Sequence, residues 1–375
     1  MAHPIRLAIL GSTGSIGQQT LDVVRAFPER FQVVALTAGN NTDLLTRQIS
    51  EFHPAIAYHN GRHFATRGKQ ESMTPEGIAA LDQADLVVIA LSGEAGLIPT
   101  LAAAKAGKRI ALANKESLVM AGEIIMAAAK DSGASILPVD SEHSAIWQCL
   151  EGEKSRPERL ILTASGGPFR RSSPEELTRM TPEQALKHPS WKMGKKVTID
   201  SASLMNKGLE IIEAHWLFGM PIDRISVVVH PQSIIHSMVE FPDGAVKAQL
   251  GCPDMRLPIQ YALCFPDRLP NKLPRLDFSK VSQLDFEAPD FVNFPCLGLA
   301  IEAGKKGATF PAVLSAANEA AVNLFLDHHI GFTDIPHLVE QTLNEHVPIS
   351  KPSVDDILNA SRWARQKVSA STVRS

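Results

Sequence analysis

The sequence has 375 residues, with 37 Lys and Arg against 40 Asp and Glu and a formal net charge of −3. Hydrophobic residues make up 44% and charged residues 21%, an ordinary globular usage that excludes disordered, collagen-like and coiled-coil chains. Near-neutral charge argues against a protein that binds nucleic acid or a membrane surface. No apolar run approaches the ~18 residues of a spanning helix, and the N-terminus lacks a signal-peptide pattern. The scattered cysteines form no disulfide framework, so we expect a multidomain cytoplasmic protein.

Residues 1–139 alternate short β-branched runs with helical patterns. The predicted strands are 6–10, 31–37, 55–58, 85–91, 109–113 and 135–139. The predicted helices between them are 17–27, 42–52, 96–106 and 121–131. Apolar strands that alternate with helices form a parallel sheet buried on both faces, with right-handed crossovers. We therefore predict an α/β fold whose N-terminal domain, residues 1–139, is a Rossmann-like doubly wound parallel sheet.

The pattern changes after residue 139. Residues 140–265 are predicted to form an α+β catalytic domain, with strands at 160–164, 197–200, 225–229 and 245–250. Residues 266–295 are rich in Pro, Asp and Phe without a clear period, so they are predicted to be a connector. Residues 296–375 are predicted to form a C-terminal helical domain, with helices at 311–326, 335–344 and 354–367.

A glycine-rich loop, Gly11-Ser-Thr-Gly-Ser-Ile-Gly17, follows the first predicted strand. Its glycines allow a tight turn, and its N–H groups with the next helix N-terminus attract a pyrophosphate. A plain βα turn could carry the same glycines, but the place at the start of a βαβ series favours nucleotide binding. The second strand ends in Ala38-Gly39-Asn40-Asn41, without the acidic residue that binds the ribose 2′-OH of NAD. This absence points towards NADP.

Acidic residues follow the sixth predicted strand, in Leu137-Pro-Val-Asp-Ser-Glu-His143. Residues two apart in an extended chain face the same way, so Asp140 and Glu142 can converge at the ligand-binding edge of the sheet. A third carboxylate comes from the stretch 200–213, where spacing alone does not choose between Glu210 and Glu213. Three oxygen donors without His or Cys suit Mg²⁺ or Mn²⁺. The alternative is that Asp140 caps a helix beside an exposed Glu142.

Polar loops supply groups suited to a phosphate monoester. The loop Ser165-Gly-Gly-Pro-Phe169 is followed by His188-Pro-Ser-Trp-Lys-Met-Gly-Lys-Lys196 and then by Ser201, Ser203, Asn206 and Lys207. Hydroxyls, an amide, an ammonium and an imidazole are what such a site needs. Trp191 either anchors its loop to the domain or closes over substrate as part of a lid, and the neighbouring Pro189 and Gly194 favour the lid.

Taken together, these motifs closely resemble the 1-deoxy-D-xylulose 5-phosphate reductoisomerase family. The matching segments run in order through Gly11–Gly17, 113–117, 137–143, 165–169, 188–191, 200–213 and 230–236, and 316–320 is similar to the family's C-terminal helix. The resemblance implies conversion of 1-deoxy-D-xylulose 5-phosphate to 2-C-methyl-D-erythritol 4-phosphate in the non-mevalonate isoprenoid pathway. It implies retro-aldol and aldol rearrangement on a divalent ion, followed by hydride transfer from NADPH.

The resemblance also implies roles residue by residue. The residues expected to bind NADPH are Thr13, Gly14, Ser15, Ile16, Gly39, Asn40, Asn41, Asn114, Glu116 and Gly194. Asp140, Glu142 and Glu210 are expected to hold Mg²⁺, Mn²⁺ or Co²⁺ and, with Lys115, to be the catalytic residues. The remaining substrate contacts are expected from Ser141, Ser165, His188, Trp191, Ser201, Asn206 and Lys207. The family is typically a homodimer, and exposed strands of the middle domain could pair across a two-fold axis.

Two other functions are compatible with parts of the pattern. One is an NADP-dependent dehydrogenase that needs no metal, and the other is a non-catalytic nucleotide-binding regulator whose carboxylates cap helices. A Cys-dependent aldehyde dehydrogenase is disfavoured, because no Cys lies in a polar loop with a nearby base.

Overall fold

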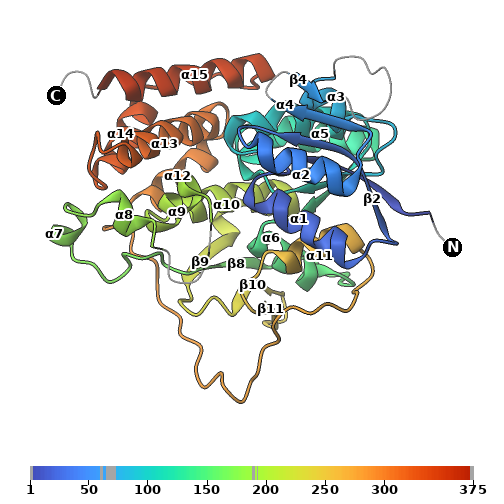
Figure 1. Ribbon diagram of the computed structural model, residues 1–375. Helices are drawn as coiled ribbons and strands as arrows, with labels where there is room; N and C mark the ends of the chain where they lie inside the picture. Colours follow the sequence, from blue (N-terminus) through green and yellow to red (C-terminus); the bar gives the residue numbers. More distant parts are fainter. Residues whose placement is uncertain (1–2, 60–61, 65–72, 188–190, 192, 372–375) are drawn as a thin grey trace. The chain divides into compact units, whose positions relative to one another are not determined.

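A computed structural model describes residues 3–59, 62–64, 73–187, 191 and 193–371 of the chain (Figure 1). Its contacts divide the chain into two units. Unit 1 comprises Met1–Ser117, Glu123–Ser144 and Asp254–Pro274. Unit 2 comprises Leu118–Gly122, Ala145–Pro253 and Arg275–Ser375.

Unit 1 contains a seven-stranded sheet with the order β4-β3-β2-β1-β5-β6-β7. Its strands are β1 Ile5–Leu10, β2 Phe31–Ala38, β3 Ile56–His59, β4 Arg62–Phe64, β5 Leu86–Ile89, β6 Arg109–Leu112 and β7 Ser135–Pro138. All neighbours pair in parallel except β3 and β4, which are antiparallel. The predicted doubly wound parallel sheet is therefore confirmed. The chain order reverses between β1 and β5, and such a switch point is where open α/β sheets bind ligands.

The helices of unit 1 bury both faces of this sheet. They are α1 Ser15–Ala26, α2 Thr42–Phe52, α3 Pro75–Ala79, the 3₁₀ turn η1 Gly93–Gly96, α4 Leu97–Lys105, most of α5 Lys115–Ser132, and α11 Arg256–Cys264. Side chains such as Leu7, Ile9 and Leu86 are fully buried, as expected for the continuous apolar strands of a parallel sheet. Figure 1 shows α11, in gold, beside α1, in blue.

Helix α11 belongs to unit 1, although its sequence lies in the region predicted to be the catalytic domain. It packs on α1, β6 and β7, and it buries Ile259 and Leu263. Arg109 of β6 also donates a hydrogen bond from Nη2 to the Phe265 carbonyl oxygen at 3.2 Å. This contact joins residues 156 positions apart, and no local pattern in the sequence signals such a contact.

Unit 2 contains a four-stranded sheet with the order β11-β10-β8-β9. Its strands are β8 Arg159–Ala164, β9 Ile225–Val229, β10 Ile235–Glu240 and β11 Val246–Leu250, of which only β8 and β9 pair in parallel. Its helices are the main part of α6 Ser141–Leu150, then α7 Pro174–Leu177, α8 Pro182–Ala185, α9 Lys195–Ala202, α10 Met205–Phe218, η2 Ile222–Arg224, α12 Cys296–Lys306, α13 Phe310–Leu326, α14 Asp334–Glu345 and α15 Val354–Ser371.

The middle and C-terminal regions share one hydrophobic core in unit 2. Buried side chains of β8, α10, α12 and α13, including Leu162, Leu209, Leu297 and Leu314, belong to the same cluster. Helices α13, α14 and α15, orange to red in Figure 1, pack against one another at the C-terminal end. The boundaries predicted at residues 139, 265 and 295 therefore mark changes of sequence pattern, whereas the compact units follow burial of apolar surface.

The strand predicted at residues 197–200 is wrong, because these residues lie in helix α9. The β-branched residues 197–199 favour a strand by propensity, but helical spacing buries Thr198, Ile199 and Ala202 together in the core. Gly194 is the N-cap residue of α9, and the Thr198 hydroxyl donates back to the Gly194 carbonyl oxygen at 2.9 Å. Tertiary packing thus outweighs local propensity here.

Strand β10 was not predicted, because its His and Ser residues are typical of a loop.

The described part of the chain contains no helix with both the length and the apolar character to cross a bilayer.

Candidate active site

The glycine-rich loop lies at the switch point of the unit 1 sheet. A Cβ atom on Gly11, which has φ +90°, would lie 2.4 Å from the Ala90 carbonyl oxygen that follows β5. A Cβ atom on Gly17 would lie 2.2 Å from the Gly11 carbonyl oxygen. Only glycine allows these approaches, so the two outer glycines of the motif fix the shape of the loop. Gly14 is the N-cap residue of α1 and makes no side-chain cap, which leaves this helix N-terminus suited to a phosphate group.

Two polar residues that sequence reasoning missed, Thr37 and Gln48, hold this loop. The backbone N–H groups of Gly11 and Ser12 donate to the Thr37 carbonyl oxygen at 3.1 and 2.8 Å. The Ser12 hydroxyl donates to Gln48 Oε1 at 2.7 Å, and Gln48 Nε2 donates to the Ser12 carbonyl oxygen at 2.9 Å. The sequence offered one signal for this contact, a glutamine on the buried face of α2, because a buried amide needs hydrogen-bond partners.

Several residues expected to bind NADPH have structural contacts at the carboxyl edge of the same sheet. Asn41 caps α2 by accepting a hydrogen bond from the Leu44 N–H at 3.0 Å. Asn114 caps α5 by accepting one from the Ser117 N–H at 2.9 Å. The Asn114 amide also donates to the Leu91 and Gly93 carbonyl oxygens, both at 2.9 Å, and thereby joins the ends of β5 and β6. The other expected residues lie in unit 1 at Thr13, Ser15, Ile16, Gly39, Asn40 and Glu116, and in unit 2 at Gly194.

The acidic motif lies where β7 ends and α6 begins. Asp140 Oδ2 is 2.8 Å from the ammonium of Lys115, the first residue of α5, and both side chains are largely buried. The His143 imidazole is 3.8 Å from the same carboxylate. The Ser141 hydroxyl donates to Glu142 Oε2 at 2.6 Å. Burial weakens solvent screening, so the attraction between the Lys115 and Asp140 charges is stronger than it would be in water.

The third carboxylate has its own set of partners on α10. Glu210 is 1% exposed, and its Oε2 lies 2.5 Å from the Lys207 ammonium. Asn206 Nδ2 donates to Glu210 Oε1 at 2.5 Å, one helical turn along. Lys207 is itself buried, so the two opposite charges compensate one another out of water.

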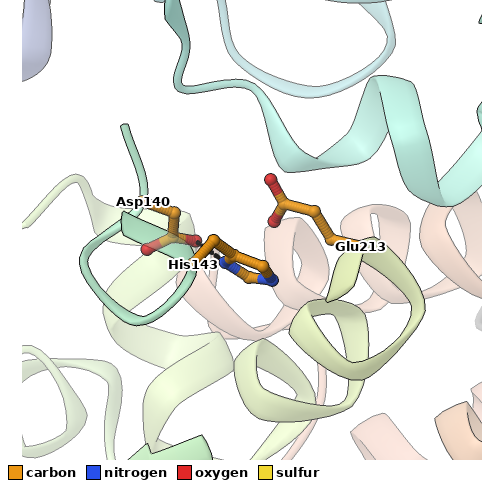
Figure 2. A group of neighbouring side chains, drawn as sticks. All are labelled: Asp140, His143 and Glu213. Atoms are coloured by element: carbon orange, nitrogen blue, oxygen red, sulfur yellow. Dashed lines mark ion pairs between the residues drawn. The ribbon is translucent and has the colours of Figure 1, made fainter. Parts of the chain in front are cut away.

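Two groups of side chains bring potential metal ligands together. In each group the ligand atoms lie within 4.8 Å of one another: Asp140, Glu142 and Glu210 form one group, and Asp140, His143 and Glu213 form the other. Figure 2 shows the second group, with the Asp140–His143 ion pair dashed and Glu213 on α10. The first group is all oxygen, which suits Mg²⁺ or Mn²⁺, whereas an imidazole in the second suits softer transition metals. Donor chemistry therefore favours Glu210 over Glu213 for a hard cation.

The all-oxygen group fits a hard divalent cation in size. Ligand oxygens lie about 2.1 Å from Mg²⁺, so two of them are at most about 4.2 Å apart across the ion. The 4.8 Å limit on the separations in this group is close to that span. The nearby ammonium groups of Lys115 and Lys207 reduce the repulsion between the carboxylates.

The predicted phosphate-binding residues of unit 2 lie on adjoining segments. A Cβ atom on Gly167, which has φ +68°, would lie 2.8 Å from the Ser201 carbonyl oxygen, so the Ser165 loop packs directly on the last turn of α9. Leu204, which has φ +61°, is the N-cap residue of α10 and follows α9 after one residue. Asn206 and Lys207 then lie in the first turn of α10. His188, which was also predicted to lie here, is outside the described residues.

Trp191 packs on a histidine that the sequence did not single out for this contact. Its ring centroid lies 6.0 Å from that of His236 of β10, with an interplanar angle of 60°. Burial lowers the pKa of His236 to about 4, because an imidazolium would lose its hydration there. Trp191 therefore contacts strand β10 of the unit 2 sheet, and its role as a lid remains a prediction.

Family models match most of the chain. Models described as 1-deoxy-D-xylulose 5-phosphate reductoisomerase and as its C-terminal domain match residues 7–122 and 136–218. A model described as the DXP reductoisomerase C-terminal domain matches residues 250–367. The protein of that name from Chlorobium phaeobacteroides (strain BS1) is 54% identical, over 98% of this chain and 99% of the relative. The chain belongs to the 1-deoxy-D-xylulose 5-phosphate reductoisomerase family.

Solved structures of reductoisomerases agree in fold over the full length. A reductoisomerase crystallised with NADPH, fosmidomycin and magnesium has a TM-score of 0.92 and 40% identity, covering 98% of each chain. The Zymomonas mobilis reductoisomerase in complex with NADPH has a TM-score of 0.89 and 42% identity, covering 99% of each chain. The family and the α/β fold predicted from the motifs are thus confirmed, whereas the individual reductoisomerase site residues remain predictions.

Proposed function

We propose that this protein catalyses the NADPH- and divalent-metal-dependent conversion of 1-deoxy-D-xylulose 5-phosphate to 2-C-methyl-D-erythritol 4-phosphate. The observation that carries the proposal is the group of three carboxylates, Asp140, Glu142 and Glu210, whose ligand oxygens lie within 4.8 Å of one another. The relatives crystallised with NADPH and with magnesium support the same cofactors for this chain. The protein is then an NADP-dependent oxidoreductase of isoprenoid precursor biosynthesis.

The three carboxylates would hold Mg²⁺ or Mn²⁺, with Co²⁺ as a further candidate. Bound there, the ion would act as a Lewis acid that stabilises negative charge on the carbonyl and hydroxyl oxygens of the sugar. Lys115 and Lys207 each face one of these carboxylates, at 2.8 and 2.5 Å. Once the carboxylates have a cation to bind, both ammonium groups can turn to substrate oxygens. Lys115 would then contact the sugar hydroxyls with Ser141, and Lys207 the phosphate.

The rearrangement conserves all atoms of the substrate, and the reduction adds a hydride from NADPH and a proton. The pyrophosphate of NADPH would lie at the uncapped N-terminus of α1, next to Gly14 and Ser15. The phosphate of the sugar would be bound by Ser165, Ser201, Asn206 and Lys207, with His188 and Trp191 closing the loop over it. Binding energy from this non-reacting end can then orient the reacting carbons.

We also propose that the protein is a cytoplasmic homodimer. Strand β11 pairs only with β10 within the described chain, so its other edge can accept a strand from a second copy. Sedimentation should then give twice the mass of the chain. A monomer at micromolar concentration would contradict this part of the proposal.

The proposed reaction is tested by NADPH oxidation with 1-deoxy-D-xylulose 5-phosphate, with and without Mg²⁺. Turnover should require both the sugar phosphate and the ion, and an excess of chelator should abolish it. Glu210→Gln should bind NADPH but lose turnover, whereas Glu123→Gln, an exposed glutamate on α5, should behave like wild type. Full activity in chelator would instead favour the metal-independent dehydrogenase.

A further inference from the structure

A buried carboxylate that the proposed reaction does not use lies next to the phosphate-binding segment. Asp200 is 1% exposed in the last turn of α9, one residue before Ser201. Its Oδ1 accepts a hydrogen bond from Asn318 Nδ2 at 2.7 Å, and its Oδ2 lies 2.9 Å from the Lys196 ammonium. Asn318 lies on α13 and is fully buried. Two regions of unit 2 that are 118 residues apart are therefore joined by one charged hydrogen bond.

This arrangement is costly as a device for stability alone. A carboxylate buried away from water loses its hydration, and an apolar pair of the same shape often stabilises a core as well or better. Asn318 Oδ1 is also buried and has no hydrogen-bond partner among the described residues, so the network is only partly satisfied. Placement of α9 by directional hydrogen bonds is a second role that such a pair can have.

The backbone around Asp200 leads directly to the phosphate-binding groups. The Ser203 hydroxyl donates to the Asp200 carbonyl oxygen at 3.3 Å, and the Met205 N–H donates to the Ser203 hydroxyl at 3.4 Å. These bonds form the turn in which Leu204 has φ +61° and after which α10 begins. A shift of Asp200 would therefore move Ser201 on one side of the turn and Asn206 and Lys207 on the other.

We propose that Asp200 and Asn318 are positioning residues that fix the turn between α9 and α10, so that Ser201, Asn206 and Lys207 converge on the substrate's phosphate. This inference rests on the proposed function, since it assumes that these three residues bind the phosphate. It also gives a role to the segment Ala316–Ala320, which resembles the family's C-terminal helix and otherwise only packs in the core. Helix α13 thereby contributes to substrate binding without touching the substrate.

The test compares three variants with wild type. Asn318→Ala removes the hydrogen bond to Asp200, and Asp200→Asn removes the charge while keeping the shape. Asn323→Ala is the matched control, since Asn323 is an exposed asparagine on the same helix. For each, we would measure KM for 1-deoxy-D-xylulose 5-phosphate, the competitive inhibition constant of inorganic phosphate, the dissociation constant of NADPH and the melting temperature.

Asn318→Ala and Asp200→Asn should raise both KM and the phosphate inhibition constant by about tenfold, while NADPH affinity stays within about twofold of wild type. Asn323→Ala should change none of these. A purely structural role would lower the melting temperature but leave the inhibition constant of phosphate unchanged, and that result would overturn the inference. If Asn318→Ala fails to fold, Asp200→Asn, which preserves the shape of the side chain, tests the inference through the same KM and phosphate inhibition constant.

Ser201→Ala separates the inference from the proposed function. If Ser201→Ala weakens phosphate inhibition and the two positioning variants do not, the inference fails while the phosphate site stands. If neither Ser201→Ala nor the positioning variants change phosphate inhibition, the proposed phosphate site is wrong and the inference falls with it.

Discussion

The buried imidazole of His236 makes a quantitative prediction about stability and pH. His236 is 6% exposed, and burial lowers its pKa from 6.5 to about 4, with the neighbouring His230 and Lys207 acting in the same direction and a hydrogen bond with the Gly251 backbone opposing them. The folded protein therefore holds a neutral ring, whereas the unfolded chain binds a proton below pH 6.5. A shift of this size corresponds to about 3 kcal/mol of the free energy of unfolding.

The sign follows from proton linkage. Since the folded pKa of His236 is lowered, its contribution is fully present above pH 6.5 and is lost as the pH falls through about 4. Urea unfolding of wild type and His236→Gln at several pH values should show this. Glutamine stays neutral and keeps an N–H donor, so its free energy of unfolding should fall by about 3 kcal/mol less than wild type between pH 6.5 and 4.

Subtracting the two curves removes the contribution of the carboxylates that titrate in the same range. His329→Gln, which replaces an exposed histidine, is the control and should follow the wild-type curve. Parallel curves for wild type and His236→Gln across this window would show that the ring is not buried as the structure has it. The contact of Trp191 with His236 would then also be in question.

Three further predictions concern backbone geometry and capping. Gly17→Ala should weaken NADPH binding more than tenfold in a fluorescence titration, because its Cβ atom would lie 2.2 Å from the Gly11 carbonyl oxygen. The matched variant Gly77→Ala, whose Cβ atom would have its nearest contact at 3.7 Å, should bind NADPH like wild type. Equal NADPH affinities of the two variants would refute the loop geometry. Gly167→Ala should raise KM for the sugar phosphate and lower the melting temperature. Gly167 has φ +68°, and a Cβ atom on it would lie 2.8 Å from the Ser201 carbonyl oxygen. An unchanged KM would show that the Ser165 loop does not contribute to the phosphate site. Asn114→Ala should lower the free energy of unfolding, measured in urea, by about 1–2 kcal/mol, because it removes the α5 cap and the hydrogen bonds to Leu91 and Gly93. A change near zero would contradict the capping role.

The parallel sheet of unit 1 could be predicted because its strands are short, continuous apolar runs. Ile5–Leu10 and Leu86–Ile89 are buried almost throughout, and such runs between helical patterns have few other solutions. The helix at residues 197–200 could not be predicted, because a run of three β-branched residues, Val197 to Ile199, is compatible with both a strand and a buried helical turn. Helix α11 lies in the region predicted to be the catalytic domain but packs on α1 in unit 1, and nothing local in its sequence indicates that contact.

The candidate site was only partly visible in the sequence. The spacing of Asp140 and Glu142 pointed to a metal site, because both follow the end of a strand. Spacing alone did not choose between Glu210 and Glu213, since helical spacing places both within two turns of Asn206. The choice of Glu210 came from the family resemblance. The hydrogen bond from Asn318 to Asp200 also could not be predicted from the sequence, because it joins residues 118 positions apart. Contacts of this kind depend on the packing of helices rather than on any motif.

The central claim is that Asp140, Glu142 and Glu210 share one divalent cation. Titration of Mn²⁺ followed by electron paramagnetic resonance, in the presence of NADPH, measures this directly. Loss of one carboxylate ligand in Asp140→Asn, Glu142→Gln or Glu210→Gln should weaken Mn²⁺ binding by at least about tenfold, while Glu213→Gln should leave it close to wild type. Wild-type Mn²⁺ affinity in Glu210→Gln, or a loss confined to Glu213→Gln, would contradict the account.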